Sequence, residues 1–343
     1  MKKHFPLLVK ITLIAIYVIF LAGSVVRMTG SGMGCPDWPK CFGYYIPPTS
    51  EEQITWQPNK DYKKGMIIVK DEALFVAEKD LKTATEFNLN NWSKYTKHNY
   101  AKFNKLHTWT EYINRLSSAL AGIPFLLLVI TCFSFWKENK KITLITLGAF
   151  ALMLFEAWLG KTVVDTNLKP TVITIHMVAG LFIVALLLWL LHIVNKKPFD
   201  PTQGDKLKYN SVFNKLLIVS VVFSLIQIAL GTQVRQFIDE QVRLYGFEHK
   251  QYSLLNPSFK FYFHRSFTIA IVLVNLAMFY LNQIKNLGYN LVNWIVFLIF
   301  LETITGILMY YAEFPLGTQA IHLLAGSVLF GLQFYLLLQS RKS

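Results

Sequence analysis

Eight stretches of mostly apolar residues limit the possible folds of this chain more than any other feature. Each is about 20 residues long, which is enough to cross a bilayer as an α-helix. They predict an all-α integral membrane protein. The expected transmembrane helices cover residues 6–26, 108–132, 142–164, 172–195, 212–234, 262–282, 290–311 and 317–339. The composition agrees, since 53% of the 343 residues are hydrophobic and 16% are charged, against about 25% charged in an ordinary soluble protein.

The formal net charge of +14 follows the predicted topology. Basic residues gather at both ends of the chain and in alternate loops, which eight helices would place on one side of the membrane. That side is normally cytoplasmic, so we expect a multi-pass protein of the cell inner (plasma) membrane with both termini in the cytoplasm. The basic residues concerned are Lys2, Lys3, Lys10, Lys137, Lys140, Lys141, Lys196, Lys197, Lys206, Lys208, Lys215, Lys285, Arg341 and Lys342. No nucleic-acid partner is expected.

The two halves of the chain repeat the same motifs in the same order. The matching segments are Gly23–Arg27 and Gly231–Arg235, Asn114-Arg115 and His264-Arg265, Glu156–Gly160 and Glu302–Gly306, and His176–Gly180 and His322–Gly326. The pattern predicts two tandem four-helix bundles of the same topology, related by an axis along the membrane normal. Residues 1–198 form the first bundle, with a long outer loop at 27–107, and residues 199–343 form the second. The part of the loop from 43 to 105 is expected to be at most a small outer cap.

Histidines near the outer ends of helices suggest haem ligation. His264 and His322 begin two helices of the second half, and two imidazoles on facing helices can hold one haem iron. The alternative is a hydrogen bond from each ring to a backbone carbonyl. In the first half, His176 matches His322, but Asn114 stands where His264 is expected. This predicts a haem site with one open position, unless His107, seven residues earlier, replaces the missing ligand.

Charged residues inside or beside the helices are the other candidates. Glu111 lies three residues before Asn114, so it can act as an acid, base or nucleophile beside an open metal site, or it is simply solvated at the helix mouth. Glu156 and Glu302 lie within helices and are either functional hydrogen-bonding or proton-path groups, or neutral and paired. Four arginines at outer helix ends suit either haem propionates or lipid phosphates. They are Arg27, Arg115, Arg235 and Arg265.

Two of the three cysteines lie close together on the predicted outer side. Cys35 and Cys41 therefore favour a disulfide, structural or redox-active, over a zinc site, which would need two further ligands. Cys132 is expected to be a packed thiol. The glycines at 30–34 have the wrong spacing for a dinucleotide site and are interpreted as a tight turn at the membrane surface.

At these residues the sequence resembles the heme A synthase family. The resemblance rests on Arg27 to Gly32 with the Cys35 and Cys41 pair, on Glu111 to Arg115, on His176, on His264-Arg265, and on Gly306 to Gly326. It covers all eight helices, though not most of the 43–105 loop. It implies an oxidoreductase that converts a methyl group of haem O to the formyl group of haem A, for haem-copper terminal oxidases.

The resemblance also implies roles for particular residues. A haem b cofactor would lie between His264 and His322, and the substrate haem O would lie in the first half with His176 as a ligand. Glu111 matches the family's glutamate, whereas Asn114 departs from its histidine. The Cys35 and Cys41 pair resembles the family's redox disulfide.

Two other classes of protein remain open. A di-haem membrane cytochrome would transfer electrons, for instance from quinol, without substrate turnover. A transporter built from parallel repeats would carry no haem. Besides membrane lipid and an electron donor that the sequence does not identify, we consider haem O synthase and a second copy of the chain as partners.

Overall fold

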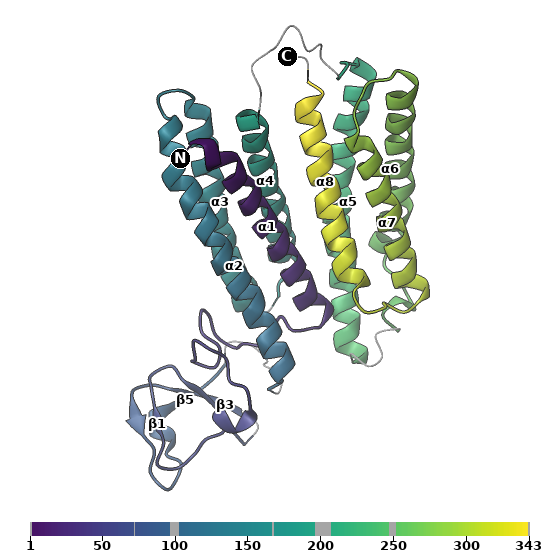
Figure 1. The fold of residues 1–343 in the computed structure, drawn as a ribbon. Coiled ribbons are helices and arrows are strands. Elements are labelled where there is room, and N and C mark those ends of the chain that lie inside the picture. The colour runs from purple at the N-terminus through teal and green to yellow at the C-terminus, as the bar shows by residue number, and fades with distance from the viewer. Residues whose placement is uncertain are drawn as a thin grey trace.

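The computed structural model describes residues 2–71, 73–96, 103–166, 168–195, 207–246 and 252–341. Within them, eight helices are long and apolar enough to cross a membrane, which confirms the predicted fold class (Figure 1). They are α1 (Phe5–Met28), α2 (Lys105–Cys132), α3 (Lys140–Asp165), α4 (Pro170–Asn195), α5 (Ser211–Tyr245), α6 (Phe259–Ile284), α7 (Leu291–Tyr311) and α8 (Thr318–Gln339). Short 3-10 helices cover Lys2–His4, Glu51–Gln53, Leu89–Asn91 and Phe133–Phe135.

Asparagine side chains define where several helices begin. Asn104 accepts hydrogen bonds from the amides of Leu106 and His107 at the start of α2, and Asn139 and Asn210 cap α3 and α5 in the same way. These bonds satisfy amides that have no partner within the helix. The eight helices lie where the apolar pattern put them, with ends shifted by at most a few residues except at the end of α5.

Helix α5 is longer than predicted. The apolar stretch stops at 234, but the helix continues through a polar extension to Tyr245 and ends at Gly246, whose φ of 88° belongs to the left-handed region. An apolar stretch predicts only the part of a helix that lies in the lipid. A polar extension with favourable i,i+4 pairs can continue the same backbone hydrogen bonds in water. Arg235 and Asp239 form such a pair in this extension, 2.7 Å apart.

Helices α1–α4 lie together on one side of the molecule and α5–α8 on the other (Figure 1). One buried apolar cluster lies around Phe125 and Leu187 in the first set. A second lies around Phe213 and Met278 in the second set and also includes Leu181 and Ala185 of α4. Helices α1 and α4 of the first set contact α8 of the second, and α4 also contacts α5. The predicted division at 198/199 lies outside the described residues, so two duplicated domains remain a prediction.

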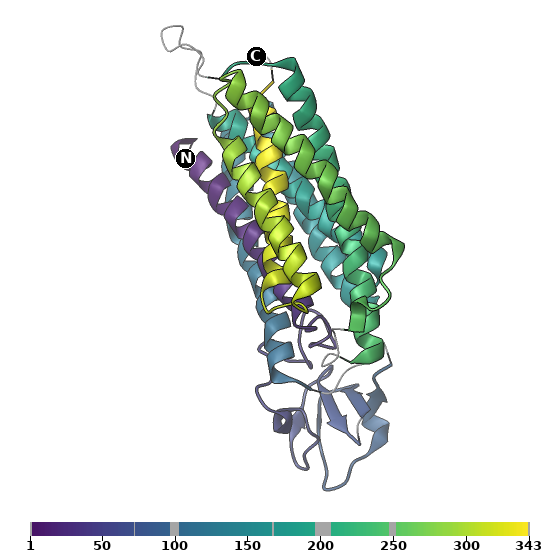
Figure 2. The ribbon, with the colours of Figure 1, turned by 90° about the vertical axis from the view of Figure 1, so that its right-hand side faces the viewer.

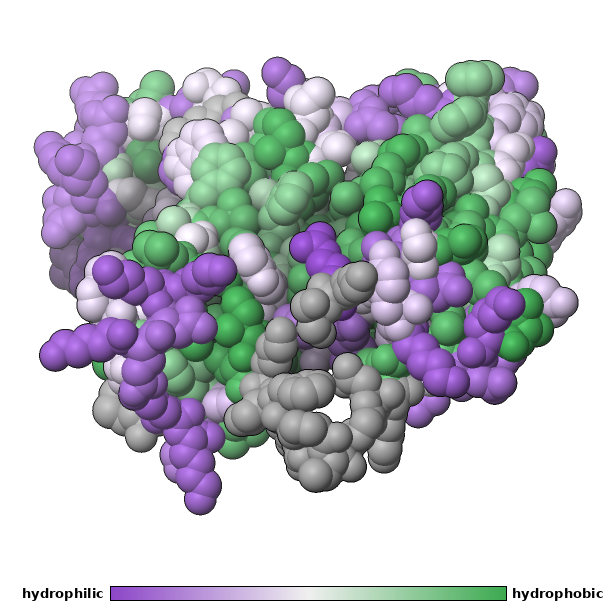
Figure 3. Space-filling view, turned by 90° about the horizontal axis from the view of Figure 1, so that it is seen from above, coloured by the Kyte–Doolittle hydropathy of each residue, from purple (hydrophilic) through white to green (hydrophobic). Residues whose placement is uncertain are grey.

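Both termini lie at one end of the helices, and the outer loop lies at the other (Figures 1 and 2). Seen from the terminal end, hydrophilic side chains gather at the rim around hydrophobic ones (Figure 3). Among the basic residues expected there, Lys196, Lys197, Lys206 and Lys342 lie outside the described residues. The arrangement agrees with the expected topology, but it does not identify which side is cytoplasmic.

The outer loop folds into a small β domain, which the sequence did not predict beyond a cap. Strands β2 (Ile67–Lys70), β3 (Ala73–Ala77) and β5 (Trp92–Lys94) form an antiparallel sheet in the order β2-β3-β5, and β1 (Asp61–Tyr62) pairs with β4 (Leu81–Lys82). Tyr62, Ile68 and Trp92 are buried in its core. At the other end of the domain, the Cys35–Cys41 disulfide packs with Phe42 and Ile67.

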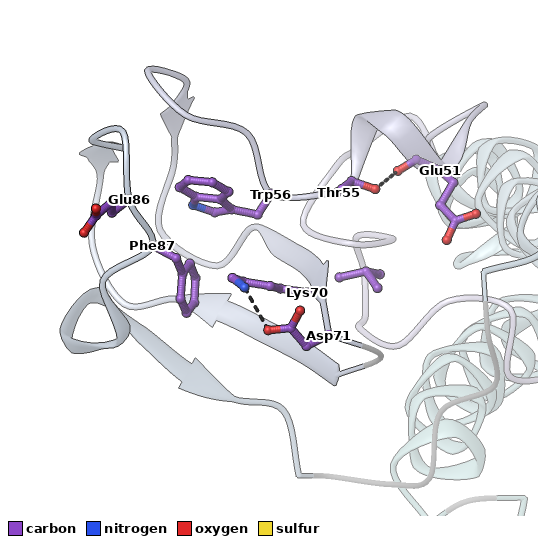
Figure 4. Close-up of a pocket in the computed structure, with 8 residues that line it drawn as sticks. Glu51, Thr55, Trp56, Lys70, Asp71, Glu86 and Phe87 are labelled. Carbon is purple, nitrogen blue, oxygen red and sulfur yellow. Dashed lines mark hydrogen bonds and ion pairs between the residues drawn. The ribbon is translucent and has the colours of Figure 1, made fainter.

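A cavity of about 450 Å³ opens on this β domain (Figure 4). Lys70 lies across its centre, 2.8 Å from the Asp71 carboxylate and 5.2 Å from the centre of the Phe87 ring. Its lining consists of Glu51, Thr55, Trp56, Val69, Lys70, Asp71, Glu86 and Phe87. None of these residues belongs to the site described next.

Candidate functional site

His264 on α6 and His322 on α8 face each other, with ring centroids 6.4 Å apart and ring planes inclined by 71°. Metal–imidazole bonds are about 2.0–2.1 Å long, so this separation has room for one metal ion bonded to both rings. His322 Nδ1 is 2.9 Å from the Thr305 hydroxyl, which leaves Nε2 for a metal. His264 Nδ1 is buried and makes no hydrogen bond to the described residues, as expected of a nitrogen that awaits a partner. The pair fits a bis-histidine haem iron.

Each half of the chain places a glutamate against a candidate histidine ligand. Glu156 Oε2 lies 2.6 Å from His176 Nδ1, and Glu302 Oε2 lies 3.2 Å from His322 Nδ1. A carboxylate at one ring nitrogen fixes the orientation of the ring and leaves the other nitrogen for a metal. These distances place each acid beside a ring nitrogen, and a hydrogen-bonding or proton-path role for the two acids stays a prediction.

Glycines at matching positions of the two halves lie beside matching site residues. A Cβ at Gly23 would lie 3.8 Å from Oδ1 of Asn114, and one at Gly231 would lie 3.2 Å from Cε1 of His264. The same correspondence holds for Gly160 with His176 and for Gly306 with His322, at 4.0 and 3.8 Å. Asn114 thus occupies in the first half the place that His264 occupies in the second.

His107, the alternative first-half ligand, lies in the first turn of α2. The Gly34 backbone covers this turn, since a Cβ at Gly34 would come within 2.5 Å of the His107 carbonyl oxygen. Seven residues of helix separate His107 from Asn114, roughly 10 Å along the axis. Whether His107 replaces the missing ligand stays a prediction.

Replacing Gly231 with alanine should disturb the His264 ring, because the added methyl group would lie 3.2 Å from it. We expect the haem content of the purified protein to fall severalfold, measured by absorption after extraction into alkaline pyridine. Gly23→Ala is the matched control, since the added methyl group would lie 3.8 Å from its nearest neighbour, Asn114 of the first half. Equal haem content in the two variants would contradict the proposed position of His264.

Glu111 is buried, with 3% of its surface exposed, so the alternative of a solvated residue at the helix mouth is wrong. Its Oε1 is paired with the Arg115 guanidinium, and its Oε2 accepts a 2.8 Å hydrogen bond from the Cys35 amide. Arg115 also donates to the backbone carbonyl of Asp37 at 2.7 Å. Arg115, expected to bind a propionate or a lipid phosphate, therefore contacts a carboxylate of the protein itself.

The loop closed by the disulfide contains a further acid, which is half-buried. Asp37 accepts hydrogen bonds from the amides of Phe42 and Gly43, at 2.6 and 2.8 Å. Burial raises the pKa of Asp37 above its ordinary value, and the two amides and the Arg115 charge oppose that rise. The disulfide between Cys35 and Cys41 is confirmed, and Cys132 is a buried free thiol, as predicted.

Arg27 and Arg235, which occupy matching positions in the two halves, share one carboxylate. Asp239 lies 2.8 Å from Arg27 Nη2 and 2.7 Å from Arg235 Nη2, and Arg235 also donates to the Arg27 carbonyl at 2.6 Å. Asp239 was not predicted as a site residue, although its i,i+4 spacing from Arg235 was a visible signal. Arg265, by contrast, lies over the rings of Phe261 and Tyr262. Propionate binding by these arginines remains a prediction.

Replacing Asp239 with alanine should leave Arg27 on α1 and Arg235 on α5 without the carboxylate that they share. We expect a loss of stability on the order of 1–2 kcal/mol, discounted because Asp239 is partly exposed. The midpoint of thermal unfolding in detergent should fall by a few degrees. Glu240→Ala is the control, because Glu240 is exposed and, among the described residues, its side chain accepts a hydrogen bond only from Gln236. An equal loss of stability in both variants would contradict the bridge.

The chain is similar in sequence to proteins that carry a name. The sequence model of the COX15-CtaA family, described as cytochrome oxidase assembly protein, matches residues 7–88 and 66–334. Relatives named "Heme A synthase" include one from Shewanella oneidensis, 25% identical over 65% of this chain and 54% of its own length. Others come from Alkalihalophilus pseudofirmus, 21% identical over 98% and 97%, and from Bacillus cereus strain AH187, 22% identical over 100% and 95%. The matched segments together span all eight helices, and the chain therefore belongs to the COX15-CtaA family of cytochrome oxidase assembly proteins.

Proposed function

We propose that this protein is a heme A synthase, a membrane oxidoreductase that oxidises a methyl group of haem O to the formyl group of haem A for haem-copper terminal oxidases. The names of the relatives support this function. The observation that carries it in the structure is the pair of facing imidazoles of His264 and His322, matched by His176 in a half where Asn114 replaces the second imidazole. One half thus suits a resident haem and the other a haem that undergoes chemistry.

In the second half, His264 and His322 would hold the iron of a haem b cofactor. When bound, this haem supplies a one-electron relay. Thr305 and Glu302 orient the His322 ring, and the lack of a side chain at Gly231 leaves space beside His264. Arg235 and Arg265 are the candidates for the propionates, since guanidinium groups bind carboxylates in a fork geometry.

In the first half, the substrate haem O binds through His176, which Glu156 orients. Asn114 is a poor iron ligand, so His176 would be the one ligand from the matching positions of this half unless His107 served as a second. Arg27 is the first-half candidate for a propionate. Glu111 would accept a proton from the reacting methyl carbon or stabilise positive charge on it. Two successive hydroxylations, each a two-electron oxidation by an external oxidant, would give a geminal diol that loses water to form the formyl group.

The topology forms part of the proposal. Residues 1–198 and 199–343 are two duplicated bundles in the inner (plasma) membrane, with both termini in the cytoplasm and the β domain outside. The haem sites then lie near the outer surface, since Arg27 and Arg235 are at the outer helix ends. Haem O synthase would supply the substrate, and a second copy of the chain is a further candidate partner.

Pigment extraction tests the function most directly. Cells that make haem O should accumulate haem A, or its alcohol intermediate, only when they also express this protein, as measured by chromatography of extracted haems. A protein that binds haem without forming either product would instead be an electron-transferring cytochrome. A protein that purifies without haem would fit the transporter alternative, and either result would overturn the proposal.

A further inference from the structure

The loop closed by the disulfide, residues 34–41, lies directly on the outer turns of α2. The Thr108 hydroxyl donates to the Gly34 carbonyl at 2.8 Å, and Cys35 Sγ lies 3.8 Å from the Thr108 carbonyl. The contact is tight, because a Cβ at Gly34 would lie 2.5–2.8 Å from backbone atoms of His107 and Thr108. Any larger residue at 34 must therefore push the loop away from α2.

Both oxygens of Glu111 accept hydrogen bonds, one from the loop and one from Arg115 on α2. The Cys35 amide donates to Oε2 at 2.8 Å, and Arg115 donates to Oε1. Arg115 is itself fixed by the loop, since it also donates to the carbonyls of Asp37 and Lys40 at 2.7 and 3.0 Å. One arginine thus joins the carboxylate to the segment between the two cysteines. An ionised carboxylate has a defined direction only when donors are aimed at it from fixed positions.

The sulfur atoms are placed to hold this loop in shape. Cys35 and Cys41 are 0% and 1% exposed and pack against Phe42, Ile54 and Ile67 of the β domain. Thiol–disulfide exchange requires a thiolate to reach a sulfur atom directly, and these side chains cover both sulfurs. The disulfide therefore suits a structural role better than repeated exchange with a partner.

We propose that the Cys35–Cys41 loop is the positioning element of Glu111, and that the disulfide acts by keeping the Cys35 amide and Arg115 aimed at its carboxylate. Arg115 is a positioning residue and does not contact the substrate. The disulfide stays oxidised throughout turnover. The inference rests on the proposed function only in that Glu111 is the reacting carboxylate there; the geometry itself does not depend on it.

The first test reads the position of Glu111 without any substrate. Dicyclohexylcarbodiimide, an apolar reagent that modifies carboxyl groups in membranes, is applied to the purified full chain, and the modified peptide is quantified by mass spectrometry. We expect little modification of Glu111 in the unaltered protein and at least a severalfold increase in Gly34→Ala, Arg115→Gln and the double variant Cys35→Ser, Cys41→Ser. Gly34→Ala keeps every reactive group and only displaces the loop.

Gly122→Ala is the matched control, since nothing lies within 4 Å of a Cβ at that position on the same helix. It should behave as the unaltered protein does. If Glu111 in Gly34→Ala and in the double variant is no more reactive than in this control, the positioning role is overturned.

The second test measures haem A formation and haem content together in the same variants. We expect Gly34→Ala and the double variant to lose at least tenfold in product formation while they keep their haem. Alkylation during turnover should trap no free thiol at Cys35 or Cys41, and trapped thiols would contradict a structural disulfide. If the unaltered protein forms no haem A, the proposed function fails, but the carbodiimide result still decides the positioning role.

Discussion

His322→Ala should abolish the b-type absorption spectrum of the purified protein, and His264→Ala should do the same. The two rings face each other at 6.4 Å, so removal of either leaves at most one protein ligand for the iron. Loss of a supporting residue around a metal ligand already costs about 10–100-fold in affinity, and loss of the ligand itself should cost more. Haem content per protein, measured by the pyridine haemochrome, is expected to fall more than about tenfold.

A control and a graded variant make this result specific. His192→Ala removes a histidine of α4 that lies against Tyr335 instead, with ring centroids 6.3 Å apart, and should keep its haem. Glu302→Gln keeps both ligands but weakens the support of the His322 ring. Its loss of haem should therefore be larger than that of His192→Ala and smaller than that of His264→Ala or His322→Ala. A normal bis-histidine spectrum in both His264→Ala and His322→Ala would show that the second-half site is wrong.

Glu111→Ala should stop product formation while the b-type spectrum stays unchanged. Proton transfer by a positioned side chain contributes roughly 10²–10⁴-fold to rate, and conversion of haem O should fall by about that factor. The spectrum should persist because Glu111 lies on α2, in the other half of the chain from His264 and His322. Chromatography of haems from cells that express the variant measures the first effect, and absorption of the purified protein measures the second.

The control for this experiment is Glu86→Gln, which changes an exposed carboxylate on the β domain. It should form haem A at the normal rate. Unchanged turnover in Glu111→Ala would remove Glu111 from the reaction and leave only a structural role for its pairing with Arg115.

The sequence predicted the membrane helices well because lipid imposes a simple rule. A helix must stay apolar for the thickness of the bilayer, so Phe5–Met28 and Thr318–Gln339 are visible as apolar stretches without knowledge of their neighbours. The polar end of α5 obeys no such rule, and it was missed. The β domain was missed as well, because its strands are two to five residues long, too short for alternation of polar and apolar residues to identify them.

The candidate site was predictable to the extent that it repeats. His176 and His322 are recognised because each follows a glutamate by the same interval, and the structure places both glutamates against the ring nitrogens. The surroundings of Glu111 do not repeat. Its partner Cys35 lies 76 residues away in the chain, and no local pattern reports a contact made by folding a long loop back onto a helix.

The shared carboxylate of Asp239 bears on how the two halves of the chain hold together. The matching segments of the two halves bring Arg27 and Arg235 to the same end of the molecule, and the second half supplies the acid that binds both. The ion pair of Arg27 therefore crosses from one half to the other. A chain cut between α4 and α5 would leave Arg27 in one piece and its carboxylate in the other, so this bridge would form only while the two pieces stay together.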